Sequence, residues 1–264
     1  MSELRFQLMH QLRLFFIALQ FFTRIPAPHW VGFKAEWLQH AVRYFPAVGW
    51  VVGSVVSAVY LAAAHWWPNS VAVLLSMIAG ILLTGAFHED GFADVCDGFG
   101  GGMNAKKTFD IMKDSRIGAY GAIGIFLMLL TKYMLLVNTP LVLVVPALLM
   151  AHPLSRLLSC SLIWLLTYAK EEGKAKPLAQ HMSSNEFGIA CLSVLLPAGL
   201  IVLHEPVIAQ RLLPGLLLMV LAAFWMARMF VKRIGGYTGD CLGAVQQLTE
   251  VMFYLGLLAY PVSK

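Results

Sequence analysis

Long apolar stretches separated by short polar segments recur along the whole chain and limit what it can fold into. A helix needs roughly 20 mostly apolar residues to span the hydrocarbon core of a bilayer. Seven stretches meet this requirement, at residues 45–67, 71–87, 119–137, 141–168, 187–204, 212–231 and 244–260. Only 12% of the residues are charged, far fewer than in a typical soluble domain. The sequence therefore predicts an all-α, polytopic membrane helix bundle that forms one domain over residues 1–264.

Two segments depart from a simple span. Residues 4–22 mix Arg5 and Arg13 with Leu and Phe, which favours an amphipathic helix in the membrane interface over a span. No small-residue cleavage site follows, so no cleavable signal peptide is predicted. The fourth stretch is long and contains Pro146 and Pro153. It is therefore predicted to be kinked, broken or divided into two shorter segments.

The basic residues predict an orientation. If seven spans alternate, one side receives the N-terminal segment and the loops after the second, fourth and sixth spans. Those segments contain Arg5, Arg13, Arg24, Lys34, Arg43, Lys106, Lys107, Lys113, Arg116, Lys170, Lys174, Lys176, Lys232 and Arg233, whereas the opposite side has Arg211 and Lys264. Because basic loops stay in the cytoplasm, we expect a multi-pass protein of the bacterial inner membrane with a cytoplasmic N-terminus and active site. Membrane orientation also accounts for the net charge of +5 without a nucleic-acid partner.

Four cysteines occur, and no two of them form a Cys-x-x-Cys pair. They are Cys96, Cys160, Cys191 and Cys241. The spacing predicts neither a disulfide framework nor a zinc site.

An acidic motif follows the second apolar stretch directly, over residues 88–98. If the helix continues, Asp90, Asp94 and Asp97 occupy positions i, i+4 and i+7 and share one stripe. Three carboxylates on one stripe repel each other, and a hard divalent cation such as Mg²⁺ is their natural partner. The adjacent His88 either belongs to this site or lies at the membrane interface. The alternative for the whole motif is a solvated helix end with ordinary surface acids.

A second polar motif follows a glycine-rich stretch at residues 100–102, which is not a Walker A loop because no Gly-Lys-Ser/Thr follows. Asp110 and Asp114 lie four residues apart, as a second pair of carboxylates on one helical face. Lys113 and Arg116 supply positive charge for phosphate oxygens. The alternative is a salt-bridged helix start.

A third motif has four glycines within residues 235–243, together with Thr238 and Asp240. It indicates a backbone that approaches a ligand closely, and a plain connecting turn is the alternative. In the last span, Gln246, Gln247 and Glu250 form a polar stripe that is expected to face the bundle interior.

Other ionisable residues lie in or beside the apolar stretches. The reasoning that places Glu250 in the interior also marks Arg156 as functional, whereas for Lys132 and Arg228 snorkelling to an interface is the alternative. Arg24, within the segment Phe-Thr-Arg-Ile-Pro at 22–26, is a candidate phosphate contact, with an orienting role as the alternative.

Four segments together resemble the cobalamin synthase family. They are residues 22–26, 87–98, 113–121 and 235–244, which occur in the order of the family and cover most of the chain. The resemblance implies an enzyme that joins adenosylcobinamide-GDP to α-ribazole, or to its 5′-phosphate, and releases GMP with the help of Mg²⁺. One departure is Gln247, where members often have Glu.

The resemblance also implies roles for the motif residues. The expected metal ligands, one of which would also act as general base, are Asp90, Asp94, Asp97, Asp110 and Asp114. The expected substrate contacts are Arg24, His88, Lys113, Arg116, Thr238 and Asp240. A homo-oligomer, or a complex with other enzymes of cobalamin assembly, is left open.

Two other functions were weighed against this one. A CDP-alcohol phosphotransferase also uses clustered Asp residues and a divalent metal in a membrane, and Asp110 and Asp114 fit the end of its motif. The stretch from Asp90 to Asp94 lacks the Ala-Arg of that motif, however. A transporter would place ionisable residues near mid-membrane in repeated halves, and no matching second half occurs.

Overall fold

The computed structural model describes residues 3–169, 180–204 and 206–259, and these are almost entirely helical. The helices are α1 (Glu3–Phe22), α2 (Ala35–Ala41), the short 3₁₀ turn η1 (Val42–Tyr44), α3 (Phe45–Ala64), α4 (Asn69–Thr84), α5 (Phe87–Gly101), α6 (Ala105–Met112), α7 (Ala119–Val137), α8 (Leu141–Leu165), α9 (Ser184–His204), α10 (Pro206–Ile234) and α11 (Gly239–Leu258). Within the described ranges, the only β-structure is an isolated bridge between Tyr168 and Tyr237. The predicted all-α class is confirmed.

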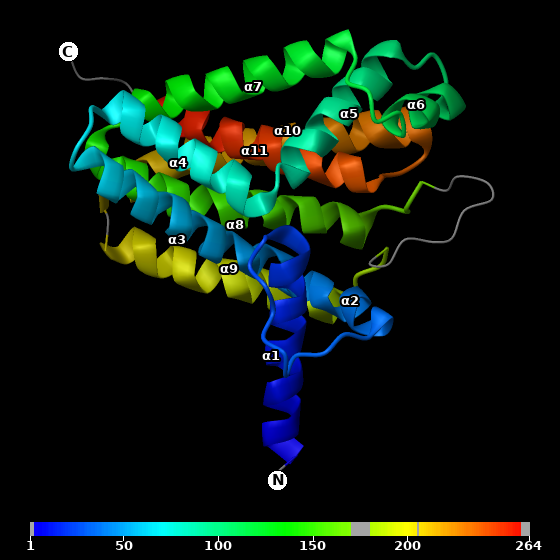
Figure 1. Ribbon diagram of the computed structural model, residues 1–264, viewed down its shortest axis with the longest axis horizontal. Coiled ribbons are helices and arrows are strands. Elements are labelled where there is room, and N and C mark those ends of the chain that lie inside the picture. The colour runs from blue at the N-terminus through cyan, green and yellow to red at the C-terminus, as the bar shows by residue number, and fades with distance from the viewer. Residues whose placement is uncertain (1–2, 170–179, 205, 260–264) are drawn as a thin grey trace.

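The long helices run side by side along one axis and form the bundle (Figure 1). In the described part of the chain, six are long and apolar enough to cross a membrane: α3 taken together with α2 and η1, and α7 to α11. A seventh crossing is counted only if α4 and α5 are taken together. The predicted polytopic membrane bundle is confirmed. The basic loop with Lys170, Lys174 and Lys176 and the predicted end of the last span at residue 260 lie outside the described residues.

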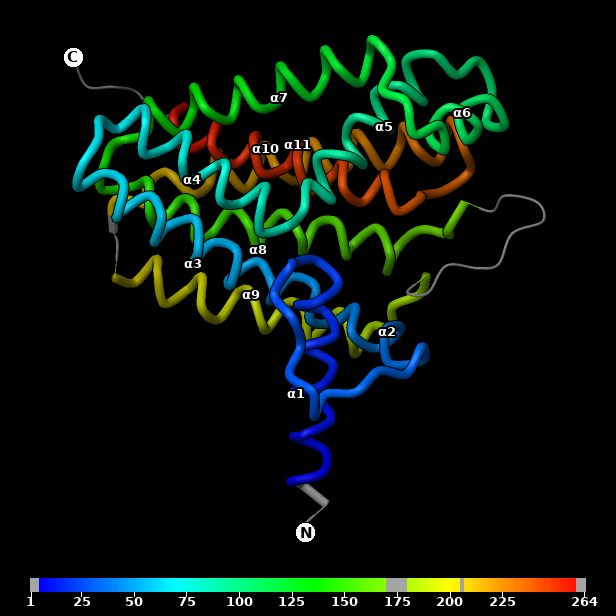
Figure 2. Tube along the Cα trace, in the orientation of Figure 1, coloured from blue at the N-terminus to red at the C-terminus, as the bar shows by residue number. Residues whose placement is uncertain are grey.

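Helix α1 lies across the bundle rather than along it, as both the ribbon and the tube show (Figures 1 and 2). Its inner face, with Leu14, Ile17 and Ala18, is buried, whereas Phe6 and Leu8 are exposed. An apolar helix that crosses the bundle axis is the arrangement expected of an interfacial helix.

A sharp bend separates α4 from α5. Gly85 and Ala86 both have left-handed backbone angles, with φ of +66° and +59°, and the helices on either side differ in direction by 88°. The predicted span 71–87 ran past this bend, since α4 ends at Thr84. The condition that the same helix continues into the acidic motif is not met. The motif lies on α5, a helix of its own that turns away from the bundle axis.

Helix α8 is a single helix despite Pro146 and Pro153, which settles the question of whether residues 141–168 form one segment or two. It is among the most buried helices and packs on α3. A Cβ at Gly49 of α3 would lie 2.4 Å from Cα of Pro153. The two backbones therefore touch at this glycine, as small residues permit in membrane bundles.

Replacing Gly49 by alanine is expected to destabilise the bundle by about 1–3 kcal/mol, because the new methyl group overlaps backbone atoms of α8 that cannot move separately. Thermal unfolding in detergent would measure the loss. Gly199→Ala in α9 is the matched control, since a Cβ there meets nothing within 4 Å. Equal melting temperatures for the two variants would contradict the close α3–α8 contact.

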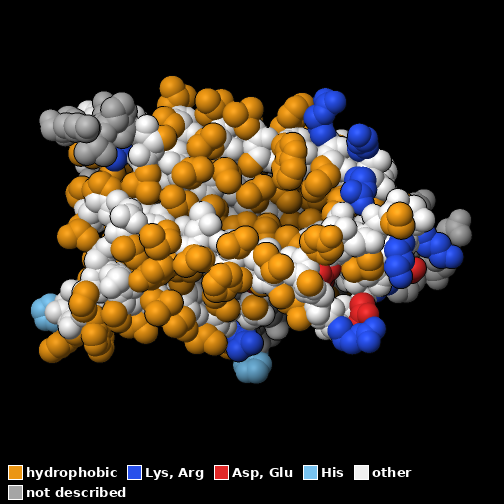
Figure 3. Space-filling model, turned by 90° about the horizontal axis from the view of Figure 1, so that it is seen from above, with side chains coloured by type: hydrophobic (Ala, Val, Ile, Leu, Met, Phe, Trp, Pro, Cys, Tyr) orange, Lys and Arg blue, Asp and Glu red, His pale blue; other side chains and the backbone are white. Residues whose placement is uncertain are grey.

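The surface of the bundle is divided along its length (Figure 3). Apolar side chains cover the flank, and most of the visible Lys, Arg, Asp and Glu side chains gather at the end where α5 and α6 lie. Exposed apolar residues on the flank include Leu82, Phe126, Leu196 and Phe224. A broad apolar flank with a charged end is typical of a protein that sits in a bilayer.

Candidate active site

Helix α5 meets the start of α11 through glycines. A Cβ at Gly91 would lie 3.0 Å from both Cα and O of Asp240, and a Cβ at Gly243 would lie 3.2 Å from O of His88. Any larger residue at either position would separate the two helices. Two of the predicted motifs, far apart in the sequence, are therefore in backbone contact.

This contact creates the acidic cluster, which we define as Asp90, Asp94, Asp97 and Asp240. The negative charges that act on Asp94 are those of Asp240, Asp90 and Asp97. Asp90 is exposed, Asp94 and Asp240 are half-buried, and Asp97 is buried. The predicted stripe on α5 is thus present, and Asp240, predicted as a nucleotide or metal contact, lies beside it.

Asp97 has a well-defined set of partners within the cluster. Its two carboxylate oxygens accept hydrogen bonds from the backbone N–H groups of Gly118, at 2.7 Å, and Gly121, at 2.8 Å. A side chain on either glycine would collide with the carboxylate. The negative charge lies at the N-terminus of α7, where the helix dipole favours it. Asp97 therefore fixes the start of α7, while its predicted role as a metal ligand stays a prediction.

Replacing Asp97 by asparagine is expected to lower the free energy of unfolding by about 1–3 kcal/mol, because an amide has one acceptor oxygen and leaves one buried N–H without a partner. Asp90→Asn, an exposed change on the same helix, should alter it little. Unfolding of both variants in the same detergent would compare them. Equal stability would show that the two hydrogen bonds do not support α7.

The second predicted pair of carboxylates is not among the charges that act on Asp94. Asp110 is exposed on α6, and Asp114 lies in the loop that follows. Arg116 donates to Asp114 at 2.7 Å, and its hydrogen bonds lower the pKa of that carboxyl to about 2. Lys113 ends α6 as its C-cap. The predicted metal ligand Asp114 and the predicted phosphate contact Arg116 thus neutralise each other here, at an exposed position.

The third motif is partly helical. α11 begins at Gly239, five residues before the predicted start of the last span. Thr238 is its N-cap and accepts a hydrogen bond from the N–H of Cys241. Gly236 packs on the carbonyl of Thr167. Gly236 and Thr238 therefore have structural roles, and the first turn of α11 presents Asp240 to the acidic cluster.

Arg24 and His88 lie near the bend between α4 and α5. The side chain of Arg24 packs on Gly85, where a Cβ would lie 3.2 Å from Nε of Arg24. The backbone N–H of Arg24 donates to the carbonyl of Leu83. His88 is buried and stacks on Phe22 at 5.4 Å. Both are close in sequence and space to the start of α5, but no observation joins them to a substrate.

The acidic cluster offers a donor set that suits Mg²⁺. All of its donors are carboxylate oxygens, which are the ligands of hard cations. Among the residues that the structure describes, no three His, Cys, Asp or Glu side chains converge closely enough to hold a metal ion by themselves. Mg²⁺ in phosphoryl-transfer enzymes usually keeps several waters and takes one or two carboxylates plus substrate phosphates. The cluster fits that pattern.

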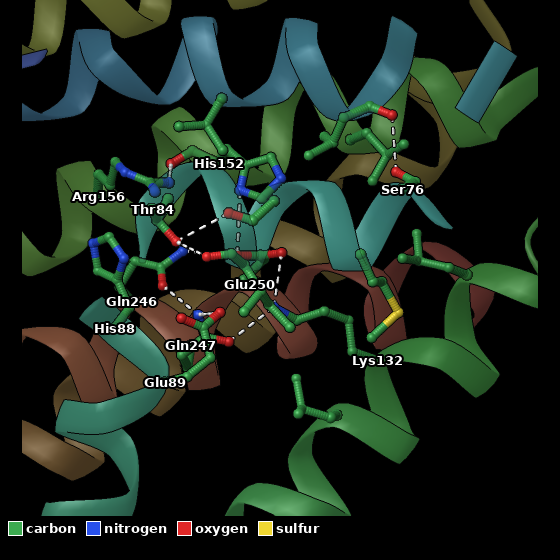
Figure 4. Close-up of a pocket in the computed structure, with 18 residues that line it drawn as sticks. Ser76, Thr84, His88, Glu89, Lys132, His152, Arg156, Gln246, Gln247 and Glu250 are labelled. Carbon is green, nitrogen blue, oxygen red and sulfur yellow. Dashed lines mark hydrogen bonds and ion pairs between the residues drawn. The ribbon is translucent and has the colours of Figure 1, made fainter. Parts of the chain in front are cut away.

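A buried polar network adjoins the site inside the bundle (Figure 4). Glu250 of α11 lies 3.1 Å from Nζ of Lys132 and accepts from Nε2 of Gln246 at 2.7 Å. Gln247 donates to Oε1 of Glu89 at 2.9 Å and to Oε1 of Gln246 at 2.9 Å. The polar stripe of the last span faces the interior, as predicted, and connects to the first turn of α5 through Glu89.

Two features of this network were not foreseen. Lys132 is buried and ion-paired, so the alternative that it snorkels to an interface is excluded. His152 lies 3.4 Å from Glu250. Both residues line a cavity of about 40 Å³ inside the network, which has room for water. Spacing in the sequence could have indicated only that Lys132 sits mid-helix in α7. Its partner comes from a helix more than a hundred residues away.

Comparisons with known proteins agree on one family. A family model described as cobalamin-5-phosphate synthase matches residues 14–258. Adenosylcobinamide-GDP ribazoletransferase from Leptothrix cholodnii is 46% identical over 261 residues, covering 96% of this chain and 97% of that protein. The proteins of the same name from Shewanella oneidensis and Vibrio cholerae are 44% and 42% identical, with 94% and 96% of each chain covered. No solved structure matches the chain. The chain therefore belongs to the cobalamin-5-phosphate synthase family.

Proposed function

We propose that the protein is an adenosylcobinamide-GDP ribazoletransferase. The observation that carries this proposal is the near full-length similarity to relatives of that name, 46% over 261 residues in one case. The acidic cluster of Asp90, Asp94, Asp97 and Asp240 supports it, because phosphoryl transfer depends on charge neutralisation and positioning more than on covalent catalysis.

In the proposed reaction, a hydroxyl oxygen of α-ribazole, or of its 5′-phosphate, forms a bond to the phosphorus that carries cobinamide. The bond from that phosphorus to the bridging oxygen breaks, and GMP leaves with this oxygen. The hydroxyl proton passes to a carboxylate of the acidic cluster. Asp94 is the best placed to accept it, since it is half-buried and central among the four.

Asp90, Asp94 and Asp240 are the proposed holders of Mg²⁺. The ion would neutralise charge on the pyrophosphate oxygens. Asp97 positions the start of α7. On the polar segment between α5 and α7, Asp110 and Asp114 remain predicted metal ligands. Lys113 and Arg116 of the same segment remain the predicted contacts for the pyrophosphate or GMP. Separation of the Asp114–Arg116 pair would free Arg116 for that role.

The proposed location is the inner membrane of a bacterium, with the N-terminus and the acidic cluster on the cytoplasmic side. Support comes from the basic residues that gather at the end of the bundle where α5 and α6 lie (Figure 3). A cytoplasmic site would give access to nucleotide substrates, and a site at the membrane surface suits a large amphipathic corrinoid.

The test is turnover by purified protein in liposomes with adenosylcobinamide-GDP, α-ribazole and Mg²⁺, with GMP and cobalamin followed together. We expect both products, and neither when EDTA is present. Product that still forms in EDTA would contradict the proposed metal dependence but would still support the proposed reaction. No product from folded protein, combined with CMP release from a CDP-alcohol and an acceptor, would replace the proposed function with the phosphotransferase alternative.

A further inference from the structure

A second cavity, of about 160 Å³, lies beside the acidic cluster. It is formed where the end of α1 and the start of α3 meet α5, α8 and α11. Its walls are largely aromatic, with Phe21, Phe22, Phe45, Phe87, Tyr168 and Tyr237. An apolar cavity of about 150 Å³ is large enough to hold benzene. The size and lining therefore suit a flat aromatic group.

The cavity and the acidic cluster are parts of one region. His88 and Gly239 line the cavity, and each lies one or two residues before a member of the cluster, Asp90 or Asp240. Gly243 lines the cavity too, and its close approach to His88 closes the contact between α5 and α11. A ligand in the cavity would thus lie next to the carboxylates.

One charged side chain, Arg156, lines this cavity and also the cavity beside Glu250. Arg156 is 3% exposed, its Nη1 donates to the carbonyl of His152, and its Nε has no hydrogen-bond partner in the described part of the chain. Two other polar groups of the lining are occupied, since Ser159 donates to the carbonyl of Leu242 and Gln246 donates to Glu250. An unsatisfied buried donor is costly, so a ligand that brings an acceptor would bind favourably there.

Ribazole has the matching chemistry. It is a ribonucleoside whose base is a benzimidazole, a flat fused ring with two apolar faces. One ring nitrogen carries the ribose, and the other has an in-plane lone pair that accepts a hydrogen bond. The rings of Phe21 and Phe45 are stacked and nearly parallel, at an interplanar angle of 4°, so part of this wall is already an aromatic stack.

We propose that this cavity binds the base of ribazole, with Arg156 donating to the free ring nitrogen and the ribose directed toward the acidic cluster. The proposal rests on the proposed function, because ribazole is the acceptor in that reaction. It assigns the aromatic wall and Arg156 to recognition of the nucleoside, separately from the carboxylates that act on the pyrophosphate.

The first test compares two acceptors with the wild-type enzyme in liposomes: α-ribazole, and the α-riboside of 5,6-dimethylindole, in which C–H replaces the free ring nitrogen. We expect the indole to have a kcat/KM at least about 10-fold lower, as for loss of a hydrogen bond to a charged donor. In Arg156→Lys, whose ammonium cannot reproduce the planar guanidinium, this preference should shrink. Equal use of the two acceptors by the wild type would overturn the hydrogen bond.

The second test uses Phe45→Leu, with Phe253→Leu as the matched control, since Phe253 is equally buried but packs on Gly215 of α10. Phe45→Leu should raise KM for α-ribazole several-fold and leave KM for adenosylcobinamide-GDP unchanged, and the control should change neither. If Phe45→Leu has the same KM for α-ribazole as the control, the proposal is overturned, and a lipid chain becomes the better candidate for the occupant of the cavity.

Binding of α-ribazole alone, measured by isothermal titration calorimetry, separates this proposal from the proposed function. If the wild type makes no GMP, the proposed function fails, whatever the nucleoside does. If it makes GMP but Phe45→Leu binds α-ribazole as tightly as Phe253→Leu does, only the cavity assignment fails.

Discussion

Asp94→Asn should lower turnover of adenosylcobinamide-GDP by about 100-fold or more while the protein stays folded. Asp94 is the central carboxylate of the acidic cluster, acted on by Asp240, Asp90 and Asp97. The change removes a negative charge and one acceptor without changing the size of the side chain. Replacing a residue that only hydrogen-bonds to a metal ligand typically lowers metal affinity or activity by about 10–100-fold. Replacing a ligand itself should lower activity by at least as much.

Two companion variants make this result specific. Glu36→Gln removes an exposed carboxylate from α2 and should leave turnover near that of the wild type. Asp110→Asn removes a carboxylate that the sequence pattern assigns to the metal but that lies outside the acidic cluster. We expect its loss to be clearly smaller than that of Asp94→Asn. Measurements of kcat across a range of Mg²⁺ concentrations would follow all three, with a raised Mg²⁺ requirement expected only for Asp94→Asn.

A different ranking would be informative. Full activity in Asp94→Asn would contradict the roles proposed for the carboxylates of the acidic cluster, while the family assignment would stand. A loss in Asp110→Asn as large as in Asp94→Asn would mean that the segment between α5 and α7 moves over the acidic cluster when substrate binds. That movement would also separate Asp114 from Arg116.

The sequence was sufficient for the class of fold and for the acidic stripe. Apolar stretches of spanning length predict membrane helices because the bilayer leaves the backbone no other partner than itself. The spacing of Asp90, Asp94 and Asp97 predicts a shared face because it depends only on the period of a helix. Both are local properties, and both were found.

The bend and the helix contacts could not be predicted in the same way. Gly85 permits a left-handed turn, but Ala86 adopts one as well, against its intrinsic preference. Nothing in the local pattern signals this, so the predicted span ran on to residue 87. The approach of Asp240 to α5 depends on two small residues, Gly91 and Gly243, that face each other across distant segments. Their pairing is a tertiary property.

The buried network shows a related limit. A Lys within an apolar stretch can reach the interface or find a partner in the interior, and hydropathy does not distinguish these outcomes. Lys132 has Glu250 at 3.1 Å and Gln247 at 2.8 Å. Its position is explained only when α7 and α11 are seen together, as in Figure 4.

Lys132→Met is expected to destabilise the protein by about 3–5 kcal/mol, because it leaves the buried carboxylate of Glu250 without its nearest cation. Glu250 would keep His152 at 3.4 Å and hydrogen bonds from Gln246 and Tyr254, which compensate its charge only in part. Unfolding by a denaturing detergent in mixed micelles would measure the loss. Arg228→Met, which removes an exposed cation that lies over the ring of Phe224, is the matched control and should cost under about 1 kcal/mol.

The double variant Lys132→Met with Glu250→Gln tests the cause. If the cost arises from an uncompensated charge, removing both charges should restore much of the stability that either single change removes. Additive losses would instead mean that each side chain acts through packing or through its other partners, such as Gln247 for Lys132. Activity adds a further distinction. Glu250 connects through Gln246 and Gln247 to Glu89, beside Asp90, so a stable double variant that still loses turnover would mean that the network positions the start of α5 for catalysis.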